Sequence, residues 1–192
     1  MAYQPYLISL LTDIVRVLNE HRYDYALAGG LAYSALVAPR ATLDVDVLIL
    51  MPDRPPAALF DGLRSALGVL VPHPAPMAFK RATIWRVIGG EGEREVTLDF
   101  ILAESEFHRT ALRRKRAVTF AGLSLPIVTP EDLVLLKALA DRPQDRADIH
   151  GIVAAYGAKL DREYLKNWAN RLGLDLGLGN EGGANTDRKE QL

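Results

Sequence analysis

The chain has 192 residues with an ordinary globular composition, 49% hydrophobic and 24% charged, and a formal net charge of −1. Such values predict one substantial hydrophobic core, and the near-zero charge argues against a protein held on nucleic acid by bulk electrostatics. The absence of cysteine excludes disulfides, thiolate metal sites and cysteine nucleophiles, so any chemistry must use oxygen and nitrogen groups.

Helices and strands alternate through the first part of the chain. Apolar residues at helical spacing predict a helix over about 5–20, and its charged residues argue against a signal peptide. A short strand that ends in a Gly-Gly pair is expected at 24–30, followed at once by a helix over 31–37. Branched residues alternate through 42–50, which predicts a second strand. The next helix is indicated by Leu59, Leu63 and Leu67.

After a proline-rich segment, the pattern predicts strands and then helices. We expect paired strands at 82–88 and 94–102 and a small hairpin over 117–128. Thr129 and Pro130 are typical of a helix start. The three expected helices cover 129–142, 145–156 and 161–172, the last two ending at Gly157 and Gly173.

The predicted fold class is α/β of the α+β type, with a mixed sheet flanked by helices and followed by a small C-terminal helical segment. We place a core with its N-terminal helix at 1–128, the helical segment at 129–173, and a tail at 174–192 that is too polar and glycine-rich to pack. No apolar run approaches the ~20 residues of a membrane-spanning helix, so we expect a cytoplasmic protein with no membrane partner.

Two aspartates interrupt the apolar strand at 42–50. Asp44 and Asp46 are two residues apart, so their carboxylates point to the same side of the strand while the valine between them faces the core. Carboxylates this close repel each other, and a hard divalent ion such as Mg²⁺ is the usual counter-ion for oxygen ligands. The simpler alternative is a strand end that carries two exposed acids, and the pair alone does not decide between the two.

Three further residues extend this candidate site. Gly29 and Gly30 lie between a strand and a helix, where backbone N–H groups at the helix start can approach a phosphate, although Gly-Gly pairs are also common in tight connections. Asp99 interrupts a later strand that could pair beside the Asp44–Asp46 strand. Three acids on adjacent strands could hold two metals roughly 3.5–4 Å apart, an arrangement suited to in-line displacement at phosphorus.

The Gly-Gly turn, the Asp-x-Asp strand and the later aspartate, in this order, resemble the signature of the polymerase-β-like nucleotidyltransferase superfamily. The likeness covers about residues 21–156 and is nearest to bacterial minimal nucleotidyltransferases and AbiEii-type proteins of toxin–antitoxin systems. In those proteins an Arg-x-Thr, matched here by Arg40 and Thr42, precedes the acidic pair, and a lysine of the helix after the core matches Lys137.

This resemblance implies a nucleotidyltransferase-type mixed sheet with the site at one edge and Mg²⁺-dependent use of a nucleoside triphosphate. The catalytic and metal-binding acids, with a two-metal site, would be Asp44, Asp46 and Asp99. The nucleotide-binding residues would be Gly29, Gly30, Arg40, Thr42 and Lys137.

Other charged residues have simpler interpretations. Lys137 could equally be a surface lysine, and Arg142, Asp145 and Asp148, which match charged positions of the family, are expected to cap helices or pair with one another. The basic segment 109–116 could follow an RNA backbone but is more typical of a solvated helix face. The histidines show no metal-ligand spacing and are expected in surface or loop positions.

Three functions remain open. The first is Mg²⁺-dependent transfer of a nucleoside monophosphate from a triphosphate to RNA, a protein or a small molecule, in a toxin–antitoxin system with a cognate toxin or antitoxin partner. The second is a non-catalytic, antitoxin-like module of the same fold that binds a nucleotide or a partner. The third is a structural domain with exposed acids. Retention of all three acids favours the first. Its premise, that three aspartates converge to bind magnesium, fails if Asp99 lies far from the other pair or if any of the three is buried against a fixed arginine.

Overall fold

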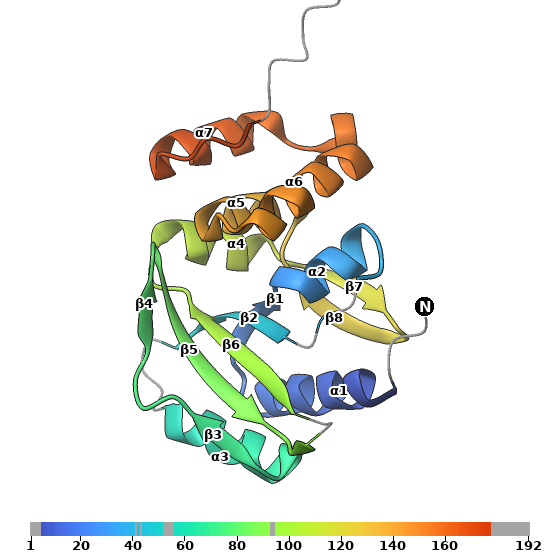
Figure 1. The fold of residues 1–192 in the computed structure, drawn as a ribbon, viewed down its shortest axis with the longest axis vertical. Coiled ribbons are helices and arrows are strands. Elements are labelled where there is room, and N and C mark those ends of the chain that lie inside the picture. Colours follow the sequence, from blue (N-terminus) through green and yellow to red (C-terminus); the bar gives the residue numbers. More distant parts are fainter. Residues whose placement is uncertain (1–4, 41, 43, 52–55, 93–94, 178–192) are drawn as a thin grey trace, which may run out of the picture.

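A computed structural model describes residues 5–40, 42, 44–51, 56–92 and 95–177 of the chain. Within these residues, helices pack on both sides of a mixed sheet, which confirms the predicted fold class (Figure 1). The predicted tail lies outside the described residues from position 178 on. No helix among the described residues is long and apolar enough to cross a membrane.

One sheet contains every strand of the described residues. The strands are β1 Asp24–Leu27, β2 Asp44–Leu50, β3 Leu70–Pro72, β4 Met77–Phe79, β5 Ala82–Gly89, β6 Val96–Leu102, β7 Arg116–Phe120 and β8 Leu123–Ile127. Their order is β3-β5-β6-β2-β1-β8-β7, and β4 pairs with β5 on the same edge as β3. The sheet is mixed because β2 pairs with β6, and β1 with β8, in parallel, whereas the other pairs are antiparallel.

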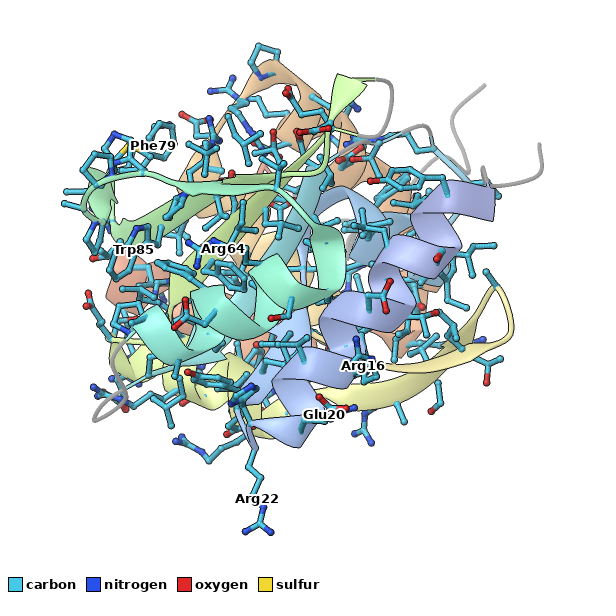
Figure 2. All side chains as sticks on the ribbon, turned by 90° about the horizontal axis from the view of Figure 1, so that it is seen from below. Arg16, Glu20, Arg22, Arg64, Phe79 and Trp85 are labelled. Carbon is cyan, nitrogen blue, oxygen red and sulfur yellow. The ribbon has the colours of Figure 1, made fainter. Side chains whose placement is uncertain are left out.

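Helices cover the sheet in two groups. They are α1 Pro5–Glu20, α2 Gly29–Leu36, α3 Pro56–Leu67, α4 Glu106–Arg114, α5 Pro130–Ala140, α6 Pro143–Tyr156 and α7 Arg162–Leu172. In Figure 1, α1 and α3 lie side by side below the sheet, and α2 and α4 to α7 lie above it. Figure 2 shows the first group from below, with Arg16 and Glu20 on α1 and Arg64 on α3.

The predicted helices have defined ends, and the first of them has a clear apolar stripe. The helix predicted over 5–20 has these bounds in the structure, and it buries leucines against the sheet. Thr129 caps α5 by accepting a hydrogen bond from the Asp132 N–H, and Gly157 and Gly173 end α6 and α7, as predicted.

Three elements of the structure were not predicted. The short strands β3 and β4 occupy the proline-rich region, where only pairing with β5 makes them strands. The helix α4 lacks a long apolar stripe in the sequence, and it starts at Ser105, whose hydroxyl accepts a hydrogen bond from the His108 N–H. Residues of β4 and α4 lie at the candidate site, so the surroundings of the site were predicted less completely than the strands that carry its acids.

Candidate functional site

The Gly-Gly pair forms the first turn of α2, directly after β1. Gly29 has a φ of +57°, a conformation that side chains other than glycine rarely adopt. A Cβ atom at this position would lie 1.8 Å from Oδ2 of Asp46. The close approach of the Asp46 carboxylate to the start of α2 therefore requires glycine here.

The sheet register brings the predicted acids onto adjacent strands. In the parallel β2–β6 pair, Asp46 lies opposite Asp99 and Asp44 lies opposite Thr97. Asp99 is 7% exposed, Asp46 is partly buried and Asp44 is exposed at the start of β2. The prediction that the Asp99 strand pairs beside the Asp44–Asp46 strand is confirmed.

An arginine forms an ion pair with the Asp99 carboxylate. Arg86 lies opposite Asp99 in the antiparallel β5–β6 pair. Its Nε donates to Oδ1 at 2.8 Å and its Nη2 donates to Oδ2 at 2.7 Å, so both carboxylate oxygens are engaged. An arginine fixed in this way against one of the acids is evidence against a metal site formed by all three aspartates.

The second acid of the pair carries the clearest electrostatic signal. Burial, reinforced by the negative charges of Asp99 and Asp44, raises the pKa of Asp46 to about 6, and the more distant charges of Arg142 and Lys137 oppose this rise. No ion-pair partner of Asp44 or Asp46 occurs among the described residues. The Asp46 carboxylate is thus held beside two other acids without a direct counter-ion.

Asp46 and Asp99, but not Asp44, line a cavity of about 390 Å³ between the sheet and α5. Its polar part includes Gly29, Asp46, Asp99 and Arg86, together with basic groups of α5 and the following loop. Its apolar part is formed by β4, β5 and the leucines of α5. A cavity with a charged part and an apolar part suits a ligand that combines phosphates with a flat ring.

A second charged cluster, formed by Arg40, Lys137, Arg142, Asp145 and Asp148, lies between α2, α5 and α6. The Lys137 Nζ, on a side chain that is 4% exposed, lies 2.5 Å from Asp148 and 3.5 Å from Asp145. Arg40 reaches Asp148 at 2.8 Å, and Arg142 reaches Asp145 at 2.7 Å. Although burial alone would raise it, the hydrogen bond from Arg142 and the charge of Lys137 hold the pKa of Asp145 below its usual value.

The nucleotide-binding residues implied by the resemblance do not all lie at the cavity. Lys137 lines the cavity, but it is buried in ion pairs rather than free at the surface. Arg40 and Thr42 lie beside Gly30, where an added Cβ would be 3.0 Å from each side chain, and they do not line the cavity. The Thr42 hydroxyl instead bonds with the backbone of Asp44.

Sequence reasoning missed several residues of this cavity. Arg142 and Asp145 pair with each other and cap α6, as expected, yet both also line the cavity. The expectation of a surface or loop position is wrong for His108, which is 2% exposed on α4 and lines the cavity. Its Nε2 has no hydrogen-bond partner among the described residues, and burial lowers its pKa. The only sign in the sequence that Arg86 belongs to the site was its position within the expected strand at 82–88.

The residues fit a divalent ion only in part. Asp44 and Asp46 supply oxygen donors on one side of β2, and the absence of a Cβ at Gly29 leaves room for the Asp46 carboxylate itself. The described residues contain no group of three or more acidic, histidine or cysteine side chains arranged to hold a metal ion. Asp99 is instead bound at both carboxylate oxygens by Arg86.

Comparison with known proteins gives a family and a fold. The family model described as "Nucleotidyl transferase AbiEii toxin, Type IV TA system" matches residues 9–166. No curated protein matches the chain.

Several solved structures are similar to this one. ANT(2″)-Ia in complex with adenylyl-2″-tobramycin has a TM-score of 0.60 at 17% identity, over 86% of this chain and 98% of that one. An antigenic nucleotidyltransferase-like protein from Paracoccidioides brasiliensis has a TM-score of 0.52 at 19% identity, over 86% and 87% of the two chains. JHP933 from Helicobacter pylori has a TM-score of 0.50 at 17% identity, over 88% and 76%. At these identities the likeness shows a shared fold.

Proposed function

Because the chain belongs to the AbiEii nucleotidyl transferase toxin family of type IV toxin–antitoxin systems, we propose that it uses Mg²⁺ to transfer a nucleoside monophosphate from a nucleoside triphosphate to an acceptor. The observation that carries this proposal is the register of Asp46 and Asp99 on adjacent parallel strands, beside the close approach of Gly29. All three residues line one cavity, so donor and acceptor can meet there.

The start of α2 binds the phosphates of the donor. Backbone N–H groups in the first turn of a helix lack partners within the helix and carry its positive dipole end, so they favour an anion. Gly29 has no side chain, so the Asp46 carboxylate also lies against this turn, and a cation held there would lie beside the phosphates. On the other side of the cavity, Lys137 and Arg142 add positive charge that stabilises the triphosphate and the departing pyrophosphate.

Asp44 and Asp46 are the residues that would hold Mg²⁺. The bound ion would neutralise charge on the phosphates and help to orient them for displacement. Asp46 is suited to this role because its carboxylate is crowded by two acids and lacks a direct counter-ion. A cation at this position relieves the repulsion that raises its pKa.

Asp99 receives the proton of the acceptor. As the acceptor oxygen bonds to the α-phosphorus, the bond from that phosphorus to the pyrophosphate oxygen breaks, and the acceptor proton moves to the Asp99 carboxylate. A carboxylate has about four lone-pair positions, and Arg86 uses two of them. Asp99 can therefore still accept this proton while Arg86 fixes its orientation.

The test is a labelling screen with the purified protein, Mg²⁺ and each of the four nucleoside triphosphates labelled at the α-phosphate. Cellular RNA, cellular protein and aminoglycosides serve as acceptor classes, the last because ANT(2″)-Ia was crystallised with an adenylylated aminoglycoside. Label should transfer to one class and pyrophosphate should be released in equal amount.

Asp46→Asn should reduce this transfer by at least about a thousandfold, which corresponds to about 4 kcal/mol of transition-state stabilisation. The matched control is Asp61→Asn, which removes an exposed carboxyl of α3 on the far side of the sheet (Figure 1). Equal transfer by the Asp46 variant and the wild type would reject the proposal. Triphosphate binding without transfer to any acceptor would favour a non-catalytic binding module.

A further inference from the structure

The ion pair between Arg86 and Asp99 bears on how many metal ions the site takes. We infer that Arg86 is a built-in cation that replaces one ion of a two-metal site, so the chain holds a single divalent ion through Asp44 and Asp46. This inference rests on the proposed function. It makes Arg86 a positioning residue, because it acts on the reaction through the orientation of Asp99.

The backbone of the sheet fixes this ion pair. Strand β5 pairs with β6 without interruption from Ile84 to Gly89, which places Arg86 directly opposite Asp99. The backbone of Arg86 is further held on its other side, where its carbonyl accepts a hydrogen bond from the His73 N–H. The two charged side chains therefore start from neighbouring, well-held positions and need no loop movement to meet.

Burial makes the contact persistent. The Asp99 side chain is 10% exposed, whereas that of Arg86 is 52% exposed. If Arg86 moved away, a buried carboxylate would lose its counter-ion, which is strongly unfavourable. Release of Arg86 to admit a metal ion would therefore have to compete with a contact that satisfies both oxygens at once.

The three acids consequently divide into two kinds. Asp44 and Asp46 have no ion-pair partner among the described residues and share one side of β2, so they are available to a divalent ion. Asp99 already has a cation, and the part of the chain that the structure describes contains no three-acid group arranged to hold a metal. The metal ion that Arg86 replaces is therefore the one that all three aspartates would share.

Arg86 can also supply part of what that ion would supply. A guanidinium has five N–H donors, and the Asp99 carboxylate accepts hydrogen bonds from two of them, one on Nε and one on Nη2. Arg86 lines the cavity, so N–H donors that Asp99 does not use can interact there with phosphate oxygens near the attacking group.

Mn²⁺ titration followed by electron paramagnetic resonance tests this inference, with a non-hydrolysable α,β-methylene nucleoside triphosphate present. The wild type should bind one Mn²⁺ per chain and show no spin coupling between metal ions. Arg86→Gln removes the charge and should open a second Mn²⁺ site, at least tenfold tighter than any second binding event of the wild type. Arg86→Lys keeps a cation and should remain at one ion.

Two controls complete the experiment. Arg64→Gln removes a comparable arginine of α3, far from the cavity and labelled in Figure 2, and should leave the count at one. In the double variant Arg86→Gln/Asp99→Asn, the second site should disappear again. Two spin-coupled ions in the wild type, or one ion in a folded Arg86→Gln protein, would overturn the inference and leave the proposed function standing. No Mn²⁺ bound with the nucleotide would reject both.

Discussion

Two groups of aspartates in this molecule differ in how their charge is balanced. The Asp145 and Asp148 carboxylates of α6 each contact basic side chains, from Arg40, Lys137 and Arg142. On the sheet, in contrast, the pKa of Asp46 is raised to about 6 by burial and by the acids next to it.

The difference separates a structural charge cluster from a functional one. Buried carboxylates that find basic partners within the fold stabilise one arrangement of helices and are poor ligands for a cation. A carboxylate held beside two others without a direct partner destabilises the unliganded protein, and a bound cation removes that penalty. We therefore expect substitutions in the helical cluster to change stability, and substitutions beside Asp46 to change activity.

The largest effect on stability should come from Asp148→Ala. This carboxylate accepts hydrogen bonds from Arg40, Lys137 and Gln144, and its loss leaves the buried Lys137 with Asp145 alone at 3.5 Å. Breaking a buried pair by removing one partner typically reduces the free energy of unfolding by about 3–5 kcal/mol. Urea denaturation monitored by circular dichroism measures this change.

The control for Asp148 is Asp61→Ala, which removes an exposed partner of Arg64. Exposed ion pairs contribute about 0–1 kcal/mol, so this change should be small. If both variants lost the same amount of stability, the distinction between a buried cluster and surface pairs would be wrong.

A smaller effect, chiefly on activity, is expected for Gly29→Ala. The new methyl group would fall on the Asp46 carboxylate, 1.8 Å from Oδ2, and would displace the group that we propose binds Mg²⁺. We expect at least a hundredfold loss of nucleotidyl transfer, or about 2.7 kcal/mol of transition-state stabilisation. Steady-state kinetics of pyrophosphate release measure it.

Gly92→Ala separates this clash from backbone strain. Gly92 has a φ of +60°, close to that of Gly29, but nothing lies within 4 Å of an added Cβ. Both variants should lose similar stability from the left-handed backbone, and only Gly29→Ala should lose activity. Loss of activity in both would show that strain, rather than contact with Asp46, is the cause.

The acid-bearing strands could be predicted from the sequence because each depends on local pattern. Alternating branched residues identified β2 and β6, and two-residue spacing placed Asp44 and Asp46 on one side. The first helix, with its long apolar stripe, was predicted with its observed bounds. The Gly-Gly pair was expected to end the strand before α2, whereas both glycines lie in the first turn of α2, where Gly29 has a positive φ.

Contacts between distant segments could not be predicted in this way. The Arg86 contact with Asp99 depends on the β5–β6 register, and a one-residue slip would place Arg86 on the other face. The burial of Lys137 depends on acids of the next helix, which the sequence shows only as nearby charges. The burial of His108 depends on the packing of α4 against β1 and β2, which lie far away in the sequence.

The smallest expected effect is a pH-dependent change in the free energy of unfolding, which reports the charge state of Asp46 in the absence of substrate. Its folded-state pKa of about 6 lies above the ordinary value of 3.8, so the folded protein binds the proton more tightly than the unfolded chain. The stability that this group contributes is complete below about pH 4 and is lost as the pH rises through about 6.

Asp46→Asn should therefore be more stable than the wild type at pH 8, and this advantage should disappear near pH 4. A pKa unit corresponds to about 1.4 kcal/mol, and because the side chain is partly exposed we expect a difference of about 1–2 kcal/mol at pH 8. Urea denaturation of both proteins at pH 4, 6 and 8 measures it, with Asp61→Asn as a control that should show no such trend. Mg²⁺ at pH 8 should stabilise the wild type more than the Asn variant. A stability difference that does not change with pH would mean that the charge of Asp46 is balanced as well as the charges of the paired acids of α6.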